Sequence, residues 1–142
     1  MKISSKEEPV KKIIMAVDDL AINLAKIKEI LDDAYDVRLA KNAQMALSML
    51  NRIDISLILL DIEMPGMTGF DFMRERAKNY RNKIDIPVIF VTGHASKEFV
   101  VRAAYAGAAD YIAKPFDAET LLRKVKNALT SATGMPFSDF NG

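Results

Sequence analysis

Hydrophobic residues along this chain alternate between two patterns, short apolar runs and stripes with helical spacing. The runs at 13–17, 57–60 and 87–91 predict buried strands, and the segments at 35–39 and 109–112 predict two more. Between the strands, apolar residues recur every three or four positions. This spacing predicts helices at 20–31, 43–50, 70–77, 96–105 and 117–129.

The helical stripes also predict which residues face inward. In the last helix these are Leu121, Leu122, Val125 and Leu129, and in the first helix Ile22, Leu24, Ile27, Ile30 and Leu31 recur at helical spacing. The helix at 96–105, with Ser96 as its N-cap, has more apolar residues than one buried face needs, namely Phe99, Val100, Val101 and Tyr105. The surplus is either scattered surface apolarity or a face for a partner or a second copy.

Strands that alternate with helices predict a doubly wound α/β fold of the (βα)5 kind, with a parallel sheet and helices on both of its faces. Nearly continuous apolar strands agree with this, because central parallel strands are buried on both sides. We expect one domain at residues 11–130. We expect a flexible N-terminal lead at 1–10, and a flexible tail or the start of a linker at 131–142.

The composition narrows the possible functions. The 142 residues include 20 Lys and Arg against 19 Asp and Glu, for a net charge of +1, which argues against direct nucleic-acid binding. Cysteine is absent, which excludes disulfides, a thiol nucleophile and cysteine zinc sites. No apolar run is long enough for a membrane span, and the N-terminus lacks a signal-peptide core. We therefore expect a soluble, cytoplasmic protein.

Polar residues with chemical potential follow the predicted strands at their carboxyl ends. They are Asp18, Asp19, Asp61, Thr92 and Lys114. Each has an ordinary explanation alone: an aspartate can cap a helix, and a lysine is commonly a solvated surface residue. However, all five fall at the edge where open α/β sheets bind their ligands, and this makes a shared site the better interpretation.

Three neighbouring carboxylates repel one another and need a counter-charge. A hard divalent cation with oxygen ligands, such as Mg²⁺, fits this requirement. One carboxylate can then act as a nucleophile toward a phosphoryl group. The Lys114 amine and the Thr92 hydroxyl can hold the phosphoryl oxygens, so the set is suited to phosphoryl transfer.

Four motifs in this order resemble the receiver domains of two-component response regulators. They are VDD at 17–19, LLDIEMPGMTG at 59–69, VTGH at 91–94 and DYIAKPF at 110–116. The resemblance covers residues 11–130 and implies a flavodoxin-like fold with strand order 2-1-3-4-5. It also implies that Asp61 is the phospho-acceptor and that Lys114 contacts the phosphoryl group. The ligands of Mg²⁺ (or Mn²⁺) would be Asp18, Asp19, Asp61 and the backbone carbonyl of Glu63. Thr92 and Tyr111 would be the switch residues, and the peptide bond before Pro115 would be cis.

The resemblance further implies a signalling switch that catalyses only its own phosphorylation and dephosphorylation. The phosphodonor would be a histidine kinase or a phosphotransfer protein. Phosphorylation would alter the surface formed by 96–105, 109–112 and 117–129. That surface would control a partner, a covalently linked output domain or a homodimer. Glu63 and His94 are expected at the site entrance, either as solvated rim residues or as groups that tune the lifetime of the phosphoryl group.

Two other functions use part of the same pattern. Phosphohydrolases with an aspartate nucleophile also use Asp, Lys, Thr and Mg²⁺, and they have a second acid two residues after the nucleophile, where Glu63 lies. They also need a substrate-covering cap, for which this sequence has no insertion. A flavodoxin-like cofactor module is disfavoured, because Asp18 and Asp19 would repel the phosphate of FMN.

Overall fold

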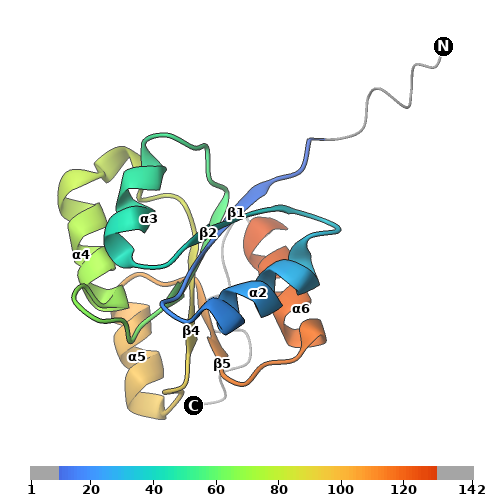
Figure 1. Cartoon of the computed structure of the whole chain (residues 1–142). Coiled ribbons are helices and arrows are strands. Elements are labelled where there is room, and N and C mark those ends of the chain that lie inside the picture. The colour runs from blue at the N-terminus through green and yellow to red at the C-terminus, as the bar shows by residue number, and fades with distance from the viewer. Residues whose placement is uncertain (1–9, 131–142) are drawn as a thin grey trace.

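The computed structural model describes residues 10–130. The segments that we expect to be flexible, at 1–10 and 131–142, therefore lie almost wholly outside the described residues. Eleven elements follow one another in a βα alternation (Figure 1). They are β1 (Ile13–Val17), α2 (Ala21–Leu31), β2 (Asp36–Ala40), α3 (Ala43–Leu50), β3 (Leu57–Asp61), α4 (Gly69–Asn79), η1 (Arg81–Lys83), β4 (Val88–Thr92), α5 (Lys97–Tyr105), β5 (Asp110–Ala113) and α6 (Ala118–Thr130).

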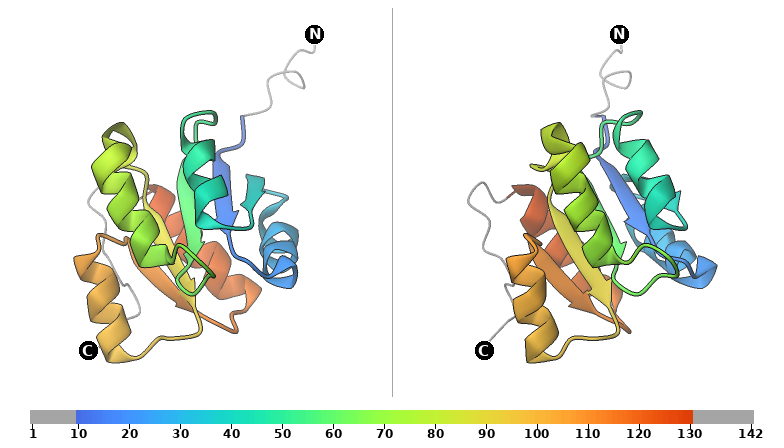
Figure 2. Two further views of the ribbon diagram at one scale, coloured as in Figure 1. Left: turned by 60° about the vertical axis from the view of Figure 1, so that its left-hand side comes forward. Right: turned by 90° about the vertical axis from the view of Figure 1, so that its left-hand side faces the viewer.

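The five strands form one parallel sheet in the order β2-β1-β3-β4-β5, which confirms the predicted fold. Helices α2 and α6 cover one face of the sheet, and α3, α4 and α5 cover the other (Figures 1 and 2). Each face has its own hydrophobic core. All five residues of β3 are buried, and the last of them is Asp61. Packing on both faces of the sheet therefore holds this carboxylate in place.

The predicted inward position of Leu122 is wrong, because this residue is 39% exposed, and Ile22, a member of the helical pattern of the first helix, is 76% exposed. The buried stripe of α2 consists of Leu24, Ile27 and Leu31. Ile22 precedes that stripe by two residues, about 200° around the helix, and so faces solvent.

The buried positions of α6 are Leu121, Lys124 and Val125. A lysine therefore occupies an inward position that an apolar pattern does not reveal. Leu129, which we also expected inward, is partly buried against the core.

Helix α5 begins and ends as predicted. The Ser96 hydroxyl accepts a hydrogen bond from the Phe99 backbone N–H at 3.4 Å, and Gly107 adopts a positive φ of 95° just after the helix. The surplus of apolar residues on this helix is also real, since Val101 is 41% exposed and Tyr105 is 90% exposed. The short helix η1 was not predicted.

Candidate functional site

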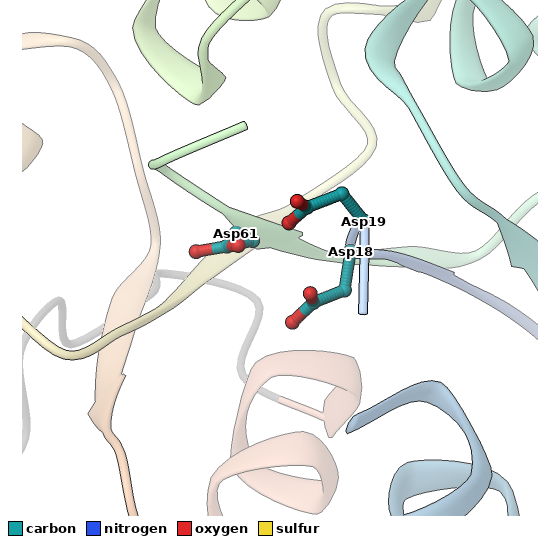
Figure 3. Close-up of side chains that lie close together, drawn as sticks. All are labelled: Asp18, Asp19 and Asp61. Carbon is teal, nitrogen blue, oxygen red and sulfur yellow. The ribbon is translucent and has the colours of Figure 1, made fainter. Parts of the chain in front are cut away.

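Three acidic residues meet at the carboxyl-terminal edge of the sheet. Asp18 and Asp19 follow β1, and Asp61 is the last residue of β3. Each offers a carboxylate oxygen, and these oxygens lie within 4.8 Å of one another (Figure 3). Asp18 and Asp61 are buried, whereas Asp19 is exposed. The arrangement places three negative charges around one small space that is open to solvent on one side.

Asp18 is oriented by a full set of donors. Its two carboxylate oxygens accept hydrogen bonds from the Leu20 backbone N–H at 2.9 Å, the Asn23 side-chain amide at 3.0 Å and the Lys114 amine at 3.0 Å. Sequence reasoning assigned no role to Asn23, which lies one turn into α2. Its only signal in the sequence is its spacing, five residues after Asp18.

Lys114 supplies the positive charge of the cluster. Its Nζ lies 3.0 Å from Asp18 Oδ2 and 3.4 Å from Asp61 Oδ1. The Lys114 backbone N–H donates to the Thr92 carbonyl at 2.8 Å, and the Lys114–Pro115 peptide bond is cis, the isomer that the resemblance implied. One ammonium group therefore contacts two of the three carboxylates, and the site retains an excess of negative charge.

This environment favours the protonated form of Asp61. Burial, the largest contribution, and the nearby charge of Asp18 raise the pKa of Asp61 from 3.8 to about 6. Lys114 and a hydrogen bond from the Glu63 backbone N–H to Asp61 Oδ1 at 3.3 Å act in the opposite direction. A second positive charge beside the Asp61 carboxylate would favour the ionised, nucleophilic form of Asp61.

Thr92 is the last residue of β4, the strand that pairs with β3, and His94 follows it by two residues. Thr92 is buried, and its hydroxyl accepts a hydrogen bond from the His94 backbone N–H at 2.9 Å. The His94 ring reaches across the edge to Glu63, where Nε2 and Oε2 are 2.6 Å apart, and it stacks on Phe99 with ring centroids 4.9 Å apart. The structure thus brings Glu63 and His94 together as a pair.

Tyr111 lies in β5, where a buried ion pair holds it. Lys124 Nζ is 3.2 Å from Asp110 Oδ1, donates to the Tyr111 carbonyl at 2.6 Å, and lies 4.4 Å from the centroid of the Tyr111 ring. Asp110 also accepts from the Tyr111 backbone N–H at 2.8 Å. Sequence reasoning missed both Asp110 and Lys124, because nothing in the local pattern marks a lysine on α6 as a partner of β5.

The turn after Asp61 packs closely against the end of β3. The Gly69 backbone N–H donates to the Ile62 carbonyl at 2.8 Å. A Cβ atom at Gly69 would lie 2.7 Å from the Asp61 carbonyl oxygen and 2.9 Å from the Ile62 Cα. Gly66 has a φ of 80°, a conformation that favours glycine. These glycines let the chain turn away and leave the acidic cluster open.

Comparison with known proteins identifies the family. The family model of the response regulator receiver domain matches residues 14–126. The chain is 33% identical over 123 residues to the chemotaxis protein CheY of Pseudomonas aeruginosa, across 85% of this chain and 98% of that protein. Among solved structures, the chemotaxis protein CheY4 of Vibrio cholerae superposes with a TM-score of 0.77 at 30% identity, covering 84% of this chain and 100% of that one.

Other relatives are much longer than the matched region. The chain is 34% identical over 128 residues to the protein-glutamate methylesterase/protein-glutamine glutaminase of Treponema pallidum, across 83% of this chain but 31% of that protein. The common part is therefore the receiver domain. Among residues 10–130, no helix has the length and apolar character that crossing a membrane requires.

Proposed function

The chain belongs to the response regulator receiver domain family of two-component systems, and on that premise we propose that Asp61 is its phospho-acceptor. The observation that most supports this assignment is the position of Asp61, a buried carboxylate at the end of β3 within 3.4 Å of the Lys114 amine. Thr92 ends the adjacent strand, so a hydroxyl and an amine flank the place where phosphoryl oxygens would lie.

The proposed reaction transfers a phosphoryl group from a phosphohistidine of a histidine kinase or a phosphotransfer protein. An oxygen of the ionised Asp61 attacks phosphorus, the P–N bond breaks, and its electron pair stays on the donor imidazole. The product is an acyl phosphate on Asp61. Lys114 would pair with one phosphoryl oxygen, and Thr92 would donate its hydroxyl proton to another. Hydrolysis of the acyl phosphate returns the chain to its initial state.

The acidic cluster fits Mg²⁺, which receiver domains bind through an acidic pocket. Its donors are all oxygens, and three carboxylates face one ammonium group, so a hard divalent cation matches both the ligand type and the charge. Asp19 and Asp61 would hold the metal directly, Asp18 would act through water, and the Glu63 carbonyl would complete the set. When bound, Mg²⁺ would offset the negative charge of the carboxylates and of the phosphoryl oxygens.

The proposed output surface consists of α5, β5 and α6. In the phosphorylated protein, the Thr92 hydroxyl would move toward the phosphoryl oxygens, and Tyr111 could then turn inward. Tyr111 is half-buried and Tyr105 is exposed, so both could take part in a changed surface. A downstream partner, a second copy of this chain or a covalently linked output domain would recognise it. We place this exchange in the cytoplasm.

We further propose that the Glu63–His94 pair shields the phosphoryl group. The two side chains come from the loops after β3 and β4 and meet across the site, with the imidazole backed by Phe99. A closed pair at this position would restrict the approach of water to phosphorus. The same contact disfavours the phosphohydrolase alternative, because the Glu63 carboxylate is engaged with His94.

Phosphorylation by acetyl phosphate tests the proposal. Wild-type protein, incubated with acetyl phosphate and Mg²⁺, should gain one phosphoryl group by intact mass, and Asp61→Asn should gain none. Asp54→Asn, at an exposed position outside the acidic cluster, is the matched control and should behave as wild type. Equal phosphorylation of wild type and Asp61→Asn would refute the assignment. Multiple turnover of a small phosphoester by wild type would favour the phosphohydrolase instead.

A further inference from the structure

A groove of about 370 Å³ lies between α4 and α5, on the face of the sheet opposite α6. The proposed phosphoryl transfer does not use it. Its lining combines apolar and basic side chains, including Phe70, Met73, Arg74, Ala77, Arg102 and Tyr105. Such a groove fits a short segment that contains both large apolar side chains and a carboxylate.

The charged groups of the groove are arranged around an aromatic centre. The Arg102 guanidinium lies over the Phe70 ring, 4.0 Å from its centroid, and Arg102 itself is exposed. At one side Arg74 is paired with Asp71. Tyr105, at the end of α5, is 90% exposed. An incoming carboxylate could pair with Arg102, and aromatic rings could cover Phe70 and Tyr105.

We propose that this groove binds residues 135–140 of the same chain, Met-Pro-Phe-Ser-Asp-Phe. This segment has the chemistry that the groove requires: Phe137 and Phe140 provide aromatic rings, and Asp139 provides a carboxylate between them. Gly134 and Pro136 are both poor helix formers by sequence.

The length of chain after α6 is sufficient for this contact. Helix α5 joins β4 to the parallel strand β5, so it ends at the amino-terminal edge of the sheet, and α6 returns to the same edge (Figure 1). Both helices pack against β5, the edge strand, from opposite faces. Packed layers of a protein lie about 10 Å apart, so helices on the two faces of one sheet are separated by roughly twice that distance, about 20 Å. The stretch from 131 to 137 spans up to about 25 Å when extended, which exceeds this separation of the two helices.

Engineered disulfides test the proposal in the full chain, which has no cysteine of its own. Ala77→Cys places a thiol in the groove, and Ser138→Cys places one between the two phenylalanines while leaving both intact. Ile84→Cys with Ser138→Cys is the matched control, because Ile84 is exposed beyond the end of α4 and outside the groove lining. The rate of disulfide formation in dilute protein under a glutathione redox buffer is followed by intact mass.

We expect the Ala77→Cys/Ser138→Cys pair to form an intramolecular disulfide about tenfold faster than the control pair, because docking raises the effective concentration of the thiols. Adding Phe137→Ser and Phe140→Ser should reduce the rate to that of the control. Equal rates for the two pairs, or a rate that is insensitive to loss of the phenylalanines, would overturn the proposal. Predominantly intermolecular disulfides would overturn it in favour of a second copy as the occupant. The experiment uses unphosphorylated protein, so none of these outcomes depends on whether Asp61 is the phospho-acceptor.

Discussion

The Glu63 and His94 side chains meet across the loops that border the acidic cluster, with Nε2 and Oε2 2.6 Å apart. The two residues come from loops after adjacent strands, β3 and β4, and each lies two residues after a site residue, Asp61 or Thr92. The imidazole also stacks on Phe99, which limits its rotation. This pair provides a link between the two loops that border the proposed phosphoryl group.

Breaking this pair should shorten the lifetime of the phosphorylated state. An exposed polar contact between two side chains contributes up to about 1 kcal/mol, so Glu63→Ala and His94→Ala should each speed autodephosphorylation by up to about fivefold. Because both variants break the same contact, the double variant should be no faster than the faster single one. The measurement is the decay of phosphorylated protein by intact mass after removal of the donor. Two unchanged rates would show that these are inert rim residues.

Asp61 should make the stability of the metal-free protein depend on pH. Its pKa is raised from 3.8 to about 6, so between these values the folded protein binds more protons than the unfolded chain. The free energy of unfolding therefore falls as the pH rises through this window. Asp61→Asn removes this effect and should be more stable than wild type by about 1–3 kcal/mol at pH 7.

The test is urea unfolding in a chelator from pH 4 to pH 7. The difference in unfolding free energy between Asp61→Asn and wild type should grow as the pH rises and level off above pH 6. Asp54→Asn serves as the control and should show no such growth. A difference that is constant across the range would contradict the raised pKa.

Gly69→Ala should destabilise the fold even though alanine is favoured in helices. The new Cβ would lie 2.7 Å and 2.9 Å from backbone atoms of Asp61 and Ile62, and neither can move without shifting the end of β3. We expect a loss of about 1–3 kcal/mol in urea unfolding, and slower phosphorylation by acetyl phosphate. Gly93→Ala is the control for stability, since nothing lies within 4 Å of its Cβ position. Equal stabilities of the two variants would show that the turn adjusts freely.

Lys124→Met should destabilise the protein strongly, because it leaves the Asp110 carboxylate buried without this cation. Breaking a buried ion pair from one side costs about 3–5 kcal/mol. Lys126→Met, at an exposed position of the same helix, should change the unfolding free energy by less than about 0.5 kcal/mol. Chemical denaturation of both variants provides the comparison. A Lys124→Met protein as stable as the Lys126→Met control would show that the pair contributes no net stability.

The sequence was sufficient to predict the order of the elements and the position of the acidic cluster. The reason is physical: a strand buried on both faces leaves an uninterrupted apolar run, so a polar residue at its end is conspicuous, as Asp61 is after Leu57–Leu60. Parallel strands then place their carboxyl ends at one edge of the sheet, which brings Asp18 and Asp61 together although they are far apart in the sequence.

The parts that escaped prediction depend on contacts between distant residues. Lys124 counts as a surface residue in any hydrophobic pattern, and only the packing of α6 on β5 reveals Asp110 as its partner. Ile22 counts as a core residue by composition, but the helix turns it to solvent. The contact between Glu63 and His94 depends in part on the pairing of β3 with β4, which the sequence indicates. It depends also on the directions of the two side chains, which the sequence does not indicate.

The stacking of His94 on Phe99 has a thermodynamic consequence. Phe99 also contacts Phe70, with ring centroids 6.5 Å apart, and Phe70 lines the groove between α4 and α5. Phe99 thus connects the Glu63–His94 pair with Phe70 and, through Phe70, with the groove. An occupant of the groove that displaces Phe70 would act on Phe99 and, through the ring stacking, on His94. Linkage then requires the effect to be mutual: whatever the occupant does to the free energy of the phosphorylated state, phosphorylation does equally to the affinity of the occupant.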